Sequence, residues 1–241
     1  MKYHSLLLSG LIAFLTTSCS VIFKMKQSDS IVKKVKVLEN DTKRVVFLPV
    51  SHVGKKSYYE SIKTMIDSLR NDNYTVYFES VSYQTELSEA KKDTIARKMR
   101  RILGWSLTSS YKDSTNKSMP KYIRNNDYVD QTAQNTGLKT GDKLVDIPQN
   151  RLIELYEQDY GTIQLNECDF NTPLNEKFKC KELQKHATRS FLITYRNKHL
   201  VRTIQTDENN KIVIMYGSGH WYDFSRRMYQ EGYKLTQGTK A

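Results

Sequence analysis

Short apolar runs alternate along the chain with segments in which apolar residues recur every three or four positions, a pattern typical of an α/β protein. The apolar runs predict buried strands at 44–50, 74–78 and 211–216. The periodic segments predict helices at 56–69, 86–103 and 148–160, a longer one at about 182–204, and a last one ending at Gly232. A strand, a helix and a second strand in succession form a βαβ unit with a right-handed crossover. We therefore expect a single α/β domain with a central, mostly parallel sheet flanked by helices.

Other segments have weaker patterns. Residues 30–38 alternate apolar and basic side chains, as a half-exposed strand would, and residues 144–146 predict a short strand. Residues 108–126 are polar and lack periodicity, which predicts a long loop of the kind that often covers a site. The stretch from Gly161 to about residue 179 is expected to be irregular.

The first residues have the pattern of an export signal. Lys2 precedes an apolar run at 6–15 that is too short to span a bilayer comfortably. The Thr16-Thr17-Ser18-Cys19 segment that follows resembles the lipobox of bacterial lipoproteins, although Thr16 stands where leucine is commonest. We therefore expect a lipoprotein signal peptide at 1–19, acylation of Cys19, a short tether at 20–30 and the domain at 31–241. The alternative is a plain secretory signal cleaved nearby.

Both alternatives place the domain outside the cytoplasm, and in the lipoprotein case a lipid anchor attaches it to a membrane of the cell envelope, facing the periplasm or the exterior. The net charge is +12, and it stays near +11 without Lys2, so the basic character belongs to the domain. Such a charge favours contact with anionic membrane surfaces or nucleic acid, and export argues against nucleic acid. A solvated basic face is the simpler interpretation.

Two cysteines remain if Cys19 is lipidated. In an oxidising compartment, Cys168 and Cys180 could close a small loop by a disulfide, or they could be two free thiols. Their spacing is not that of a CxxC motif, which argues against a zinc or redox site.

Two histidines each follow a predicted buried strand. His52 comes after the 44–50 strand, His220 follows the 211–216 strand, and Glu79 follows the strand at 74–78. Because open α/β sheets place their sites at the carboxyl ends of strands, all three side chains could face one crevice. Two histidines and a carboxylate are suitable ligands for a divalent metal such as Zn²⁺ or Mn²⁺. The repeated strand, turn and histidine also suggest two pseudo-symmetric halves.

The turn before His220 permits other interpretations, which the sequence supports weakly. Gly217 and Gly219 could begin a dinucleotide loop, but Tyr222 stands where the third glycine belongs. Ser218 occupies a strand-to-helix turn like a nucleophile elbow, yet the order G-S-G-H is not G-x-S-x-G. Ser51, beside His52, has the same limitation.

Arg196, on the long helix, could hold a carboxylate or stabilise an oxyanion, or simply face solvent. His186 and His199 are expected at the surface.

Several segments resemble motifs of the TraB/PrgY family. In the first half they are V-V-F-L-P-V-S-H-V-G and Y-F-E-S, and near the end they are Tyr195-Arg196-Asn197, Y-G-S-G-H and E-G-Y. That family includes the Tiki proteins and bacterial GumN-like proteins. The resemblance covers both ends of the chain and hardly any of the middle. It implies a TraB/Tiki-like fold and a site built from His52, Glu79, Arg196 and His220, with Gly217 and Gly219 in the second turn.

The resemblance also implies a chemistry. Tiki-type members are described as Mn²⁺- or Co²⁺-dependent proteases, so we expect a metal-dependent hydrolase acting on peptides, with Mn, Co or Zn as cofactor. His52, His220 and Glu79 would be the ligands, and Glu79 and Arg196 the catalytic groups. Pro49 departs from the pattern, because it stands where the first motif has glycine. That departure motivates the alternative, a non-catalytic lipoprotein that binds a peptide or small molecule.

Overall fold

The computed structural model describes residues 34–80, 82–83, 87–106, 110–115, 127–180, 183 and 185–238, without the side chains of 185 and 186. The expected signal peptide, the tether and Cys19 lie outside these residues. Within the part of the chain that the structure describes, no helix is long and apolar enough to cross a membrane.

A six-stranded sheet forms the centre of the molecule, with the order β6-β4-β7-β2-β1-β8. The four strands from β6 to β2 are parallel to their neighbours, while β1 and β8 extend the sheet by antiparallel pairing. The expected mixed α/β fold with a mostly parallel sheet is confirmed. The strands are β1 (Lys36–Glu39), β2 (Arg44–Val50), β4 (Thr75–Phe78), β6 (Lys143–Leu144), β7 (Lys211–Gly217) and β8 (Lys234–Gln237).

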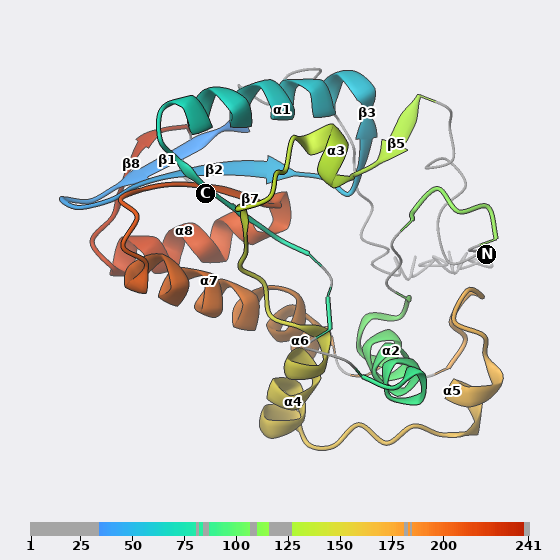
Figure 1. Ribbon diagram of the computed structural model, residues 1–241. Coiled ribbons are helices and arrows are strands. Elements are labelled where there is room, and N and C mark those ends of the chain that lie inside the picture. Colours follow the sequence, from blue (N-terminus) through green and yellow to red (C-terminus); the bar gives the residue numbers. More distant parts are fainter. Residues whose placement is uncertain are drawn as a thin grey trace, which may run out of the picture.

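Helices cover both faces of the sheet. Figure 1 shows α1 (Lys56–Asn71) above it, with α7 (Tyr195–Thr206) and α8 (Trp221–Gln230) below. Alternate residues of β2 face opposite layers, as the pleat requires. Val46 and Leu48 belong to the core beneath α1, and Val45 and Phe47 to the core that α7 and α8 complete.

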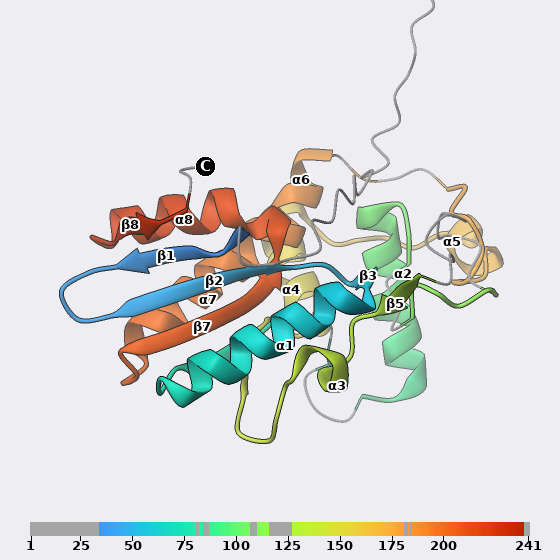
Figure 2. The ribbon, with the colours of Figure 1, turned by 90° about the horizontal axis from the view of Figure 1, so that it is seen from above.

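A third apolar core lies beyond the sheet. It joins α2 (Glu89–Leu103), α4 (Gln149–Tyr160), α6 (Lys185–Arg189) and the π-helix Ser190–Thr194, and includes Met99, Leu152, Tyr156 and Phe191. Figure 2 shows α2, α4 and α6 on the side toward which the carboxyl ends of β2 and β7 point. The site of the next subsection lies at this end of the sheet.

Smaller elements complete the fold. β3 (Val53–Lys55) pairs with β5 (Tyr128–Asp130) in a two-stranded sheet, and α3 (Ala133–Thr136) packs beside α1. A disulfide joins Cys168 to Cys180 and brackets α5 (Glu167–Asn171).

Most predicted elements are found, and the differences have local causes. The long helix expected at 182–204 is interrupted by the π-helix, and the irregular stretch contains α5. Asn166 begins α5 with a reciprocal capping box to Asp169, a signal present in the sequence. The strands β3, β5 and β8 were not predicted. Of the expected loop at 108–126, only residues 110–115 are described, and they form turns without a helix or strand.

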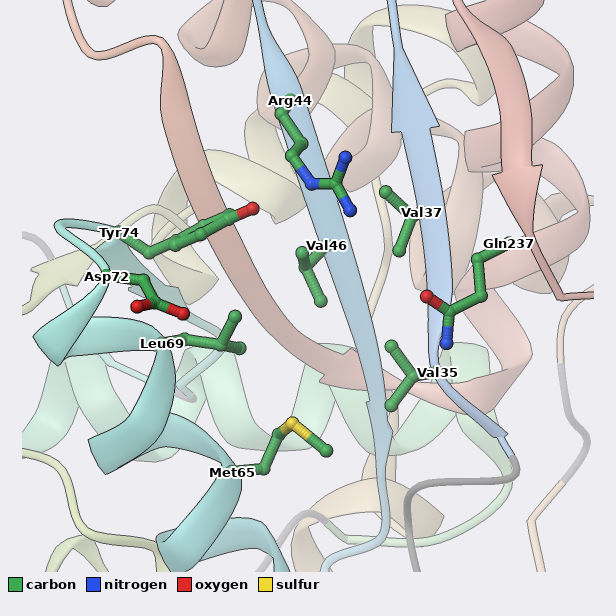
Figure 3. A pocket seen from close by; sticks show the side chains of 9 residues that line it. All are labelled: Val35, Val37, Arg44, Val46, Met65, Leu69, Asp72, Tyr74 and Gln237. Carbon is green, nitrogen blue, oxygen red and sulfur yellow. The ribbon is translucent and has the colours of Figure 1, made fainter.

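A cavity of about 200 Å³ lies between α1 and the strands β1, β2 and β8. Figure 3 shows side chains of α1 facing those of β1 and β2 across it. Its lining includes Arg44, the first residue of β2, so it lies far along the strand from the carboxyl end. The remaining lining residues are Val35, Val37, Val46, Met65, Leu69, Asp72, Tyr74 and Gln237.

Candidate functional site

Strand order brings the expected site residues to one edge of the sheet. β7 lies between β4 and β2, and all three strands are parallel. Glu79 directly follows β4, His52 follows β2 by two residues, and His220 ends the short 3₁₀ turn Ser218–His220 after β7. Arg196 lies in the first turn of α7, the helix that Figure 1 shows below the sheet, and its side chain contacts Glu79 and His220.

Glu79 is at the centre of the group. Its side chain is 6% exposed, and its Oε2 accepts a hydrogen bond of 2.6 Å from the backbone N–H of Gly217. Its Oε1 accepts one of 2.8 Å from Arg196 Nη2 and lies 3.8 Å from His52 Nε2. Burial opposes ionisation, but Arg196, the two histidines and the Gly217 N–H together lower the pKa of Glu79 to about 2. Glu79 is therefore a carboxylate at neutral pH.

Arg196 is held by a second carboxylate that the sequence did not single out. Asp146 accepts bonds from Arg196 Nε (2.8 Å) and Nη2 (2.5 Å), and both residues are buried. Burial alone would lower the pKa of Arg196, but Glu79 and Asp146 raise it well above its usual value. The pKa of Asp146 is raised, because burial raises it by more than the charge of Arg196 lowers it. Asp146 follows β6 as Glu79 follows β4, so the same reasoning about strand ends could have identified it.

His220 has a defined tautomer. Its Nδ1 lies 2.7 Å from Asn197 Oδ1, and Asn197 Nδ2 donates to the His220 carbonyl at 3.0 Å and to Asp223 at 3.1 Å. An amide oxygen only accepts, so Nδ1 carries the proton and Nε2 presents its lone pair to Arg196 Nη1 at 3.3 Å. Burial, followed by the charge of Arg196, lowers the pKa of His220 to about 4. The imidazole is therefore neutral at physiological pH.

His52 is the accessible member of the group, with 34% of its side chain exposed. Its ring stacks on Tyr111, with centroids 5.5 Å apart and planes 3° apart. Tyr111 lies in the part of the predicted loop that the structure describes, and it was not predicted as a site residue. Burial, and then the charges of Glu79 and Asp130, raise the pKa of its phenol to about 12.

The turn residues have separate roles. Pro49 continues β2 opposite Tyr216, and its carbonyl accepts a hydrogen bond from the Tyr58 hydroxyl. Gly217 supplies an N–H to Glu79, and a Cβ there would make ordinary contact with Glu79 and His220. At Gly219 a Cβ would meet only Ile193 at 4.0 Å, so neither glycine is required by a clash.

Within the described residues, no hydrogen bond joins either serine considered as a nucleophile to a histidine. Ser51 Oγ donates to the carbonyl of Val53, and Ser218 is exposed. His199 is exposed, as expected, and the side chain of His186 lies outside the described residues.

The three residues expected to bind a metal do not surround one point in this arrangement, because the guanidinium of Arg196 lies against both Glu79 and His220. Among the described residues, no group of three or more His, Cys, Asp or Glu side chains is arranged to hold a metal ion. His52 and Glu79 alone fit better. His52 Nε2 and Glu79 Oε1 lie 3.8 Å apart. Two atoms that each bind one metal ion at about 2.0–2.2 Å can be separated by that distance.

Comparisons with known proteins leave the function to be argued from this geometry, because no protein-family model, no curated protein and no solved structure matches the chain.

Proposed function

We propose that the chain is an exported, lipid-anchored hydrolase of the TraB/Tiki-like kind that acts on peptides. The observation that carries the proposal is the convergence of His52, Glu79, Arg196 and His220 at the carboxyl ends of three parallel strands. These are the four residues that the family resemblance implies, and they come from four separate segments of the chain. The pattern of ionisation also suits catalysis, since buried charges with shifted pKa values concentrate at functional sites.

His52 is the general base in this proposal. Its side chain is accessible, and its Nε2 faces the Glu79 carboxylate, which leaves Nδ1 to take a proton from a water molecule. The water attacks the carbonyl carbon of a peptide. Arg196 stabilises the negative charge that develops on the carbonyl oxygen by exchanging its bond to His220 Nε2 for that oxygen. The proton held by His52 then passes to the leaving amine as the C–N bond breaks. The Glu79 carboxylate, 3.8 Å from Nε2, stabilises the imidazolium by its charge.

A divalent metal is the cofactor that the resemblance implies, and His52 and Glu79 are the residues that would hold it. Bound there, Mn²⁺, Co²⁺ or Zn²⁺ would act as a Lewis acid toward water or a carbonyl group, and would activate water in place of the base His52, whose Nε2 would then be a ligand. His220 would need Arg196 to move before it could become a ligand, since Arg196 Nη1 lies 3.3 Å from its lone-pair nitrogen.

Hydrolysis by the purified full-length protein tests the proposal. We expect turnover of some members of a panel of peptides and esters, assayed with EDTA and with each of the three metals in turn. His52→Ala should lower kcat by at least about 100-fold, the size of a general-base contribution. His199→Ala is the matched control, because His199 is exposed on α7, and it should retain activity. Absence of turnover under every condition would contradict the proposal.

The second candidate is a ligand-binding lipoprotein with the same fold and no turnover. It is favoured by the bonding of Glu79, because each of its oxygens already accepts a hydrogen bond from a protein donor. The same panel separates the candidates. A pure binder would give saturable binding of a peptide or small molecule without any product, whereas the hydrolase would release product.

The pseudo-symmetry of the two halves belongs to the same proposal. It is supported by the adjacent, parallel pairing of β2 and β7, each followed within a few residues by a site histidine. An experimental structure would test it by superposing residues 44–54 on residues 212–222, which pairs His52 with His220. If the halves are related, the two histidines should fall at equivalent places in the superposition.

A further inference from the structure

We propose that Tyr111 is a positioning residue for His52, and that Asp130 holds Tyr111 in the position required. The proposal rests on the hydrolase site proposed above, but its first test needs no substrate.

The stacking of the two rings is the first observation. The planes of His52 and Tyr111 differ by 3° and their centroids lie 5.5 Å apart, so the phenol forms an offset stack with the imidazole and covers part of one face. Glu79, at 3.8 Å, is too far from Nε2 to fix the ring by a hydrogen bond. Within the described part of the chain, Tyr111 is thus the contact that can prevent the exposed imidazole from rotating away from Glu79.

The anchoring of Tyr111 is the second observation. Asp130 accepts a 2.9 Å hydrogen bond from the Tyr111 backbone N–H at Oδ1 and a 2.7 Å bond from Ser110 Oγ at Oδ2. Lys112 Nζ donates to the carbonyl of Tyr128 at 2.7 Å. Three successive loop residues are therefore bound to β5, two of them through one carboxylate.

The same strand and the residue after it also hold the backbone of His52 and Val53. Asp130 pairs with Val53 in the small sheet of β3 and β5, and the N–H of Gln131 donates to the His52 carbonyl at 2.8 Å. β5 therefore holds the backbone from which the His52 imidazole extends, and it holds the stacked Tyr111 phenol through Asp130. Both partners of the stack are therefore held in place by β5 and the residue after it.

Tyr111 also borders the charged centre of the site. The charge of Glu79 raises the pKa of its phenol and that of Arg196 opposes the rise, so its ring lies within electrostatic range of both. The phenol is neutral at physiological pH and adds no charge to the site. Its contribution is the ring itself, which orients His52 and shields part of one of its faces from water.

Histidine resonances test the stack directly. In protein labelled with ¹³C-histidine, the ring protons of His52, assigned with His52→Gln, should lie upfield because of the ring current of Tyr111. Tyr111→Phe keeps the ring and should keep that shift. Tyr111→Leu and Asp130→Ala should each move the His52 signals downfield while leaving those of His199 and His220 in place. Tyr222→Ala, which removes an exposed tyrosine, is the control and should change nothing.

Kinetics provide the second test. Tyr111→Leu should lower kcat by about 10- to 100-fold with a smaller change in KM, as expected when a catalytic group loses its orientation. Tyr111→Phe should restore wild-type kcat. If the wild-type protein shows no turnover, the proposed function fails, while the resonances still decide whether the stack exists.

Unchanged His52 signals in folded Tyr111→Leu, or in folded Asp130→Ala, would overturn the proposal. A circular dichroism melt establishes that each variant is folded. If Tyr111→Leu fails to fold, wild-type His52 signals without an upfield shift relative to free imidazole would overturn the proposal on their own.

Discussion

Arg196 is the residue on which the charge balance of the site depends. Its Nε and Nη2 donate to Asp146, and Nη2 also donates to Glu79. All three side chains are nearly fully buried. One positive charge thus lies between two carboxylates, and His220 adds none because its imidazole is neutral at physiological pH. Removing Arg196 would leave two buried carboxylates without their common partner, which costs much more than the loss of a surface ion pair.

Arg196→Ala should therefore lower the free energy of unfolding by about 3–5 kcal/mol, the range for breaking a buried ion pair. Arg202→Ala is the matched control, since Arg202 is an exposed arginine on the same helix, and it should change stability by no more than about 0.5 kcal/mol. Urea unfolding at pH 7 measures both. Equal stability of the two variants would show that the carboxylates do not rely on Arg196.

His220 should make the fold sensitive to mild acid. Folding lowers its pKa from 6.5 to about 4, so the unfolded chain binds this proton first as the pH falls. Stability from the neutral imidazole is therefore present above pH 6.5 and is lost between pH 6.5 and 4, by at most about 3 kcal/mol. Glu79 behaves differently: its pKa falls from 4.5 to about 2, so its contribution is lost only below pH 4.5.

Unfolding of the wild type and of His220→Asn, followed from pH 7 to 4.5, measures this effect. Asparagine retains a donor near Nδ1 but does not titrate, so the variant should have a flatter profile over this range. Asp146, whose raised pKa acts in the opposite direction, is common to both proteins. Parallel profiles would contradict a buried neutral His220.

Residues near strand ends could be predicted from the sequence, and residues brought in by loops could not. His52, Glu79 and His220 follow apolar runs, so their common location follows from the parallel sheet alone. Asp146 also lies just after a strand, but the predicted strand at 144–146 included it, so it was not recognised as a strand-end residue. Tyr111 reaches the site because Asp130 binds its backbone, and this contact between distant residues leaves no periodic signal.

At the scale of elements, the disulfide loop around α5 shows how α2 is fixed. Arg100 of α2 is fully buried, and its guanidinium donates to the carbonyls of Asp169, Thr172 and Pro173. All three acceptors lie between Cys168 and Cys180. The closed loop thus presents carbonyl oxygens to a buried cation, and opening the loop would release them.

Reduction should consequently lower the free energy of unfolding by about 3 kcal/mol, as expected for a loop of this length. Urea unfolding with and without dithiothreitol measures the change. The Cys168→Ser/Cys180→Ser double variant should be destabilised by a similar amount, and dithiothreitol should not affect it further. A wild type that is insensitive to reduction, despite complete thiol labelling in the unfolded state, would contradict this account.

The elements that the sequence did not reveal share a physical reason. β3, β5 and β8 are only three or four residues long and depend on partners that are distant in sequence or on a sheet edge. The π-helix directly before α7 continues the helical path, so apolar spacing predicted one long helix across it. Its place beside Arg196 agrees with the frequent occurrence of such segments at functional sites.

At the scale of the whole molecule, each layer has a distinct role. Two apolar cores hold α1, α7 and α8 against the sheet, and the third packs α2 and α4 beyond the carboxyl ends of the strands. The site lies at the carboxyl ends of β4, β7 and β2, and Figure 2 shows α2 and α4 on the side toward which β2 and β7 point. The N-terminal segment with Cys19 precedes the described domain, consistent with a domain held at a membrane by a short tether in the function we propose.

Cys19→Ala should move the protein from the membrane fraction to the soluble extracellular or periplasmic fraction, because a lipid anchor requires that thiol. Metabolic labelling with a fatty acid should mark the wild type and not the variant. The charge of +12 can retain some protein at anionic membranes, so the fractions should be washed at high salt. Membrane retention of the unlabelled variant after such a wash would contradict anchoring at Cys19.

The central claim is that the Glu79 carboxylate is part of a hydrolytic site, and one comparison tests it most directly. Glu79→Gln retains the shape of the side chain and removes its charge, while Glu60→Gln makes the same change on the exposed face of α1. We expect the wild type and Glu60→Gln to hydrolyse a peptide substrate at equal rates, and Glu79→Gln to do so at least about 100-fold more slowly. Equal turnover by a folded Glu79→Gln protein would contradict the claim.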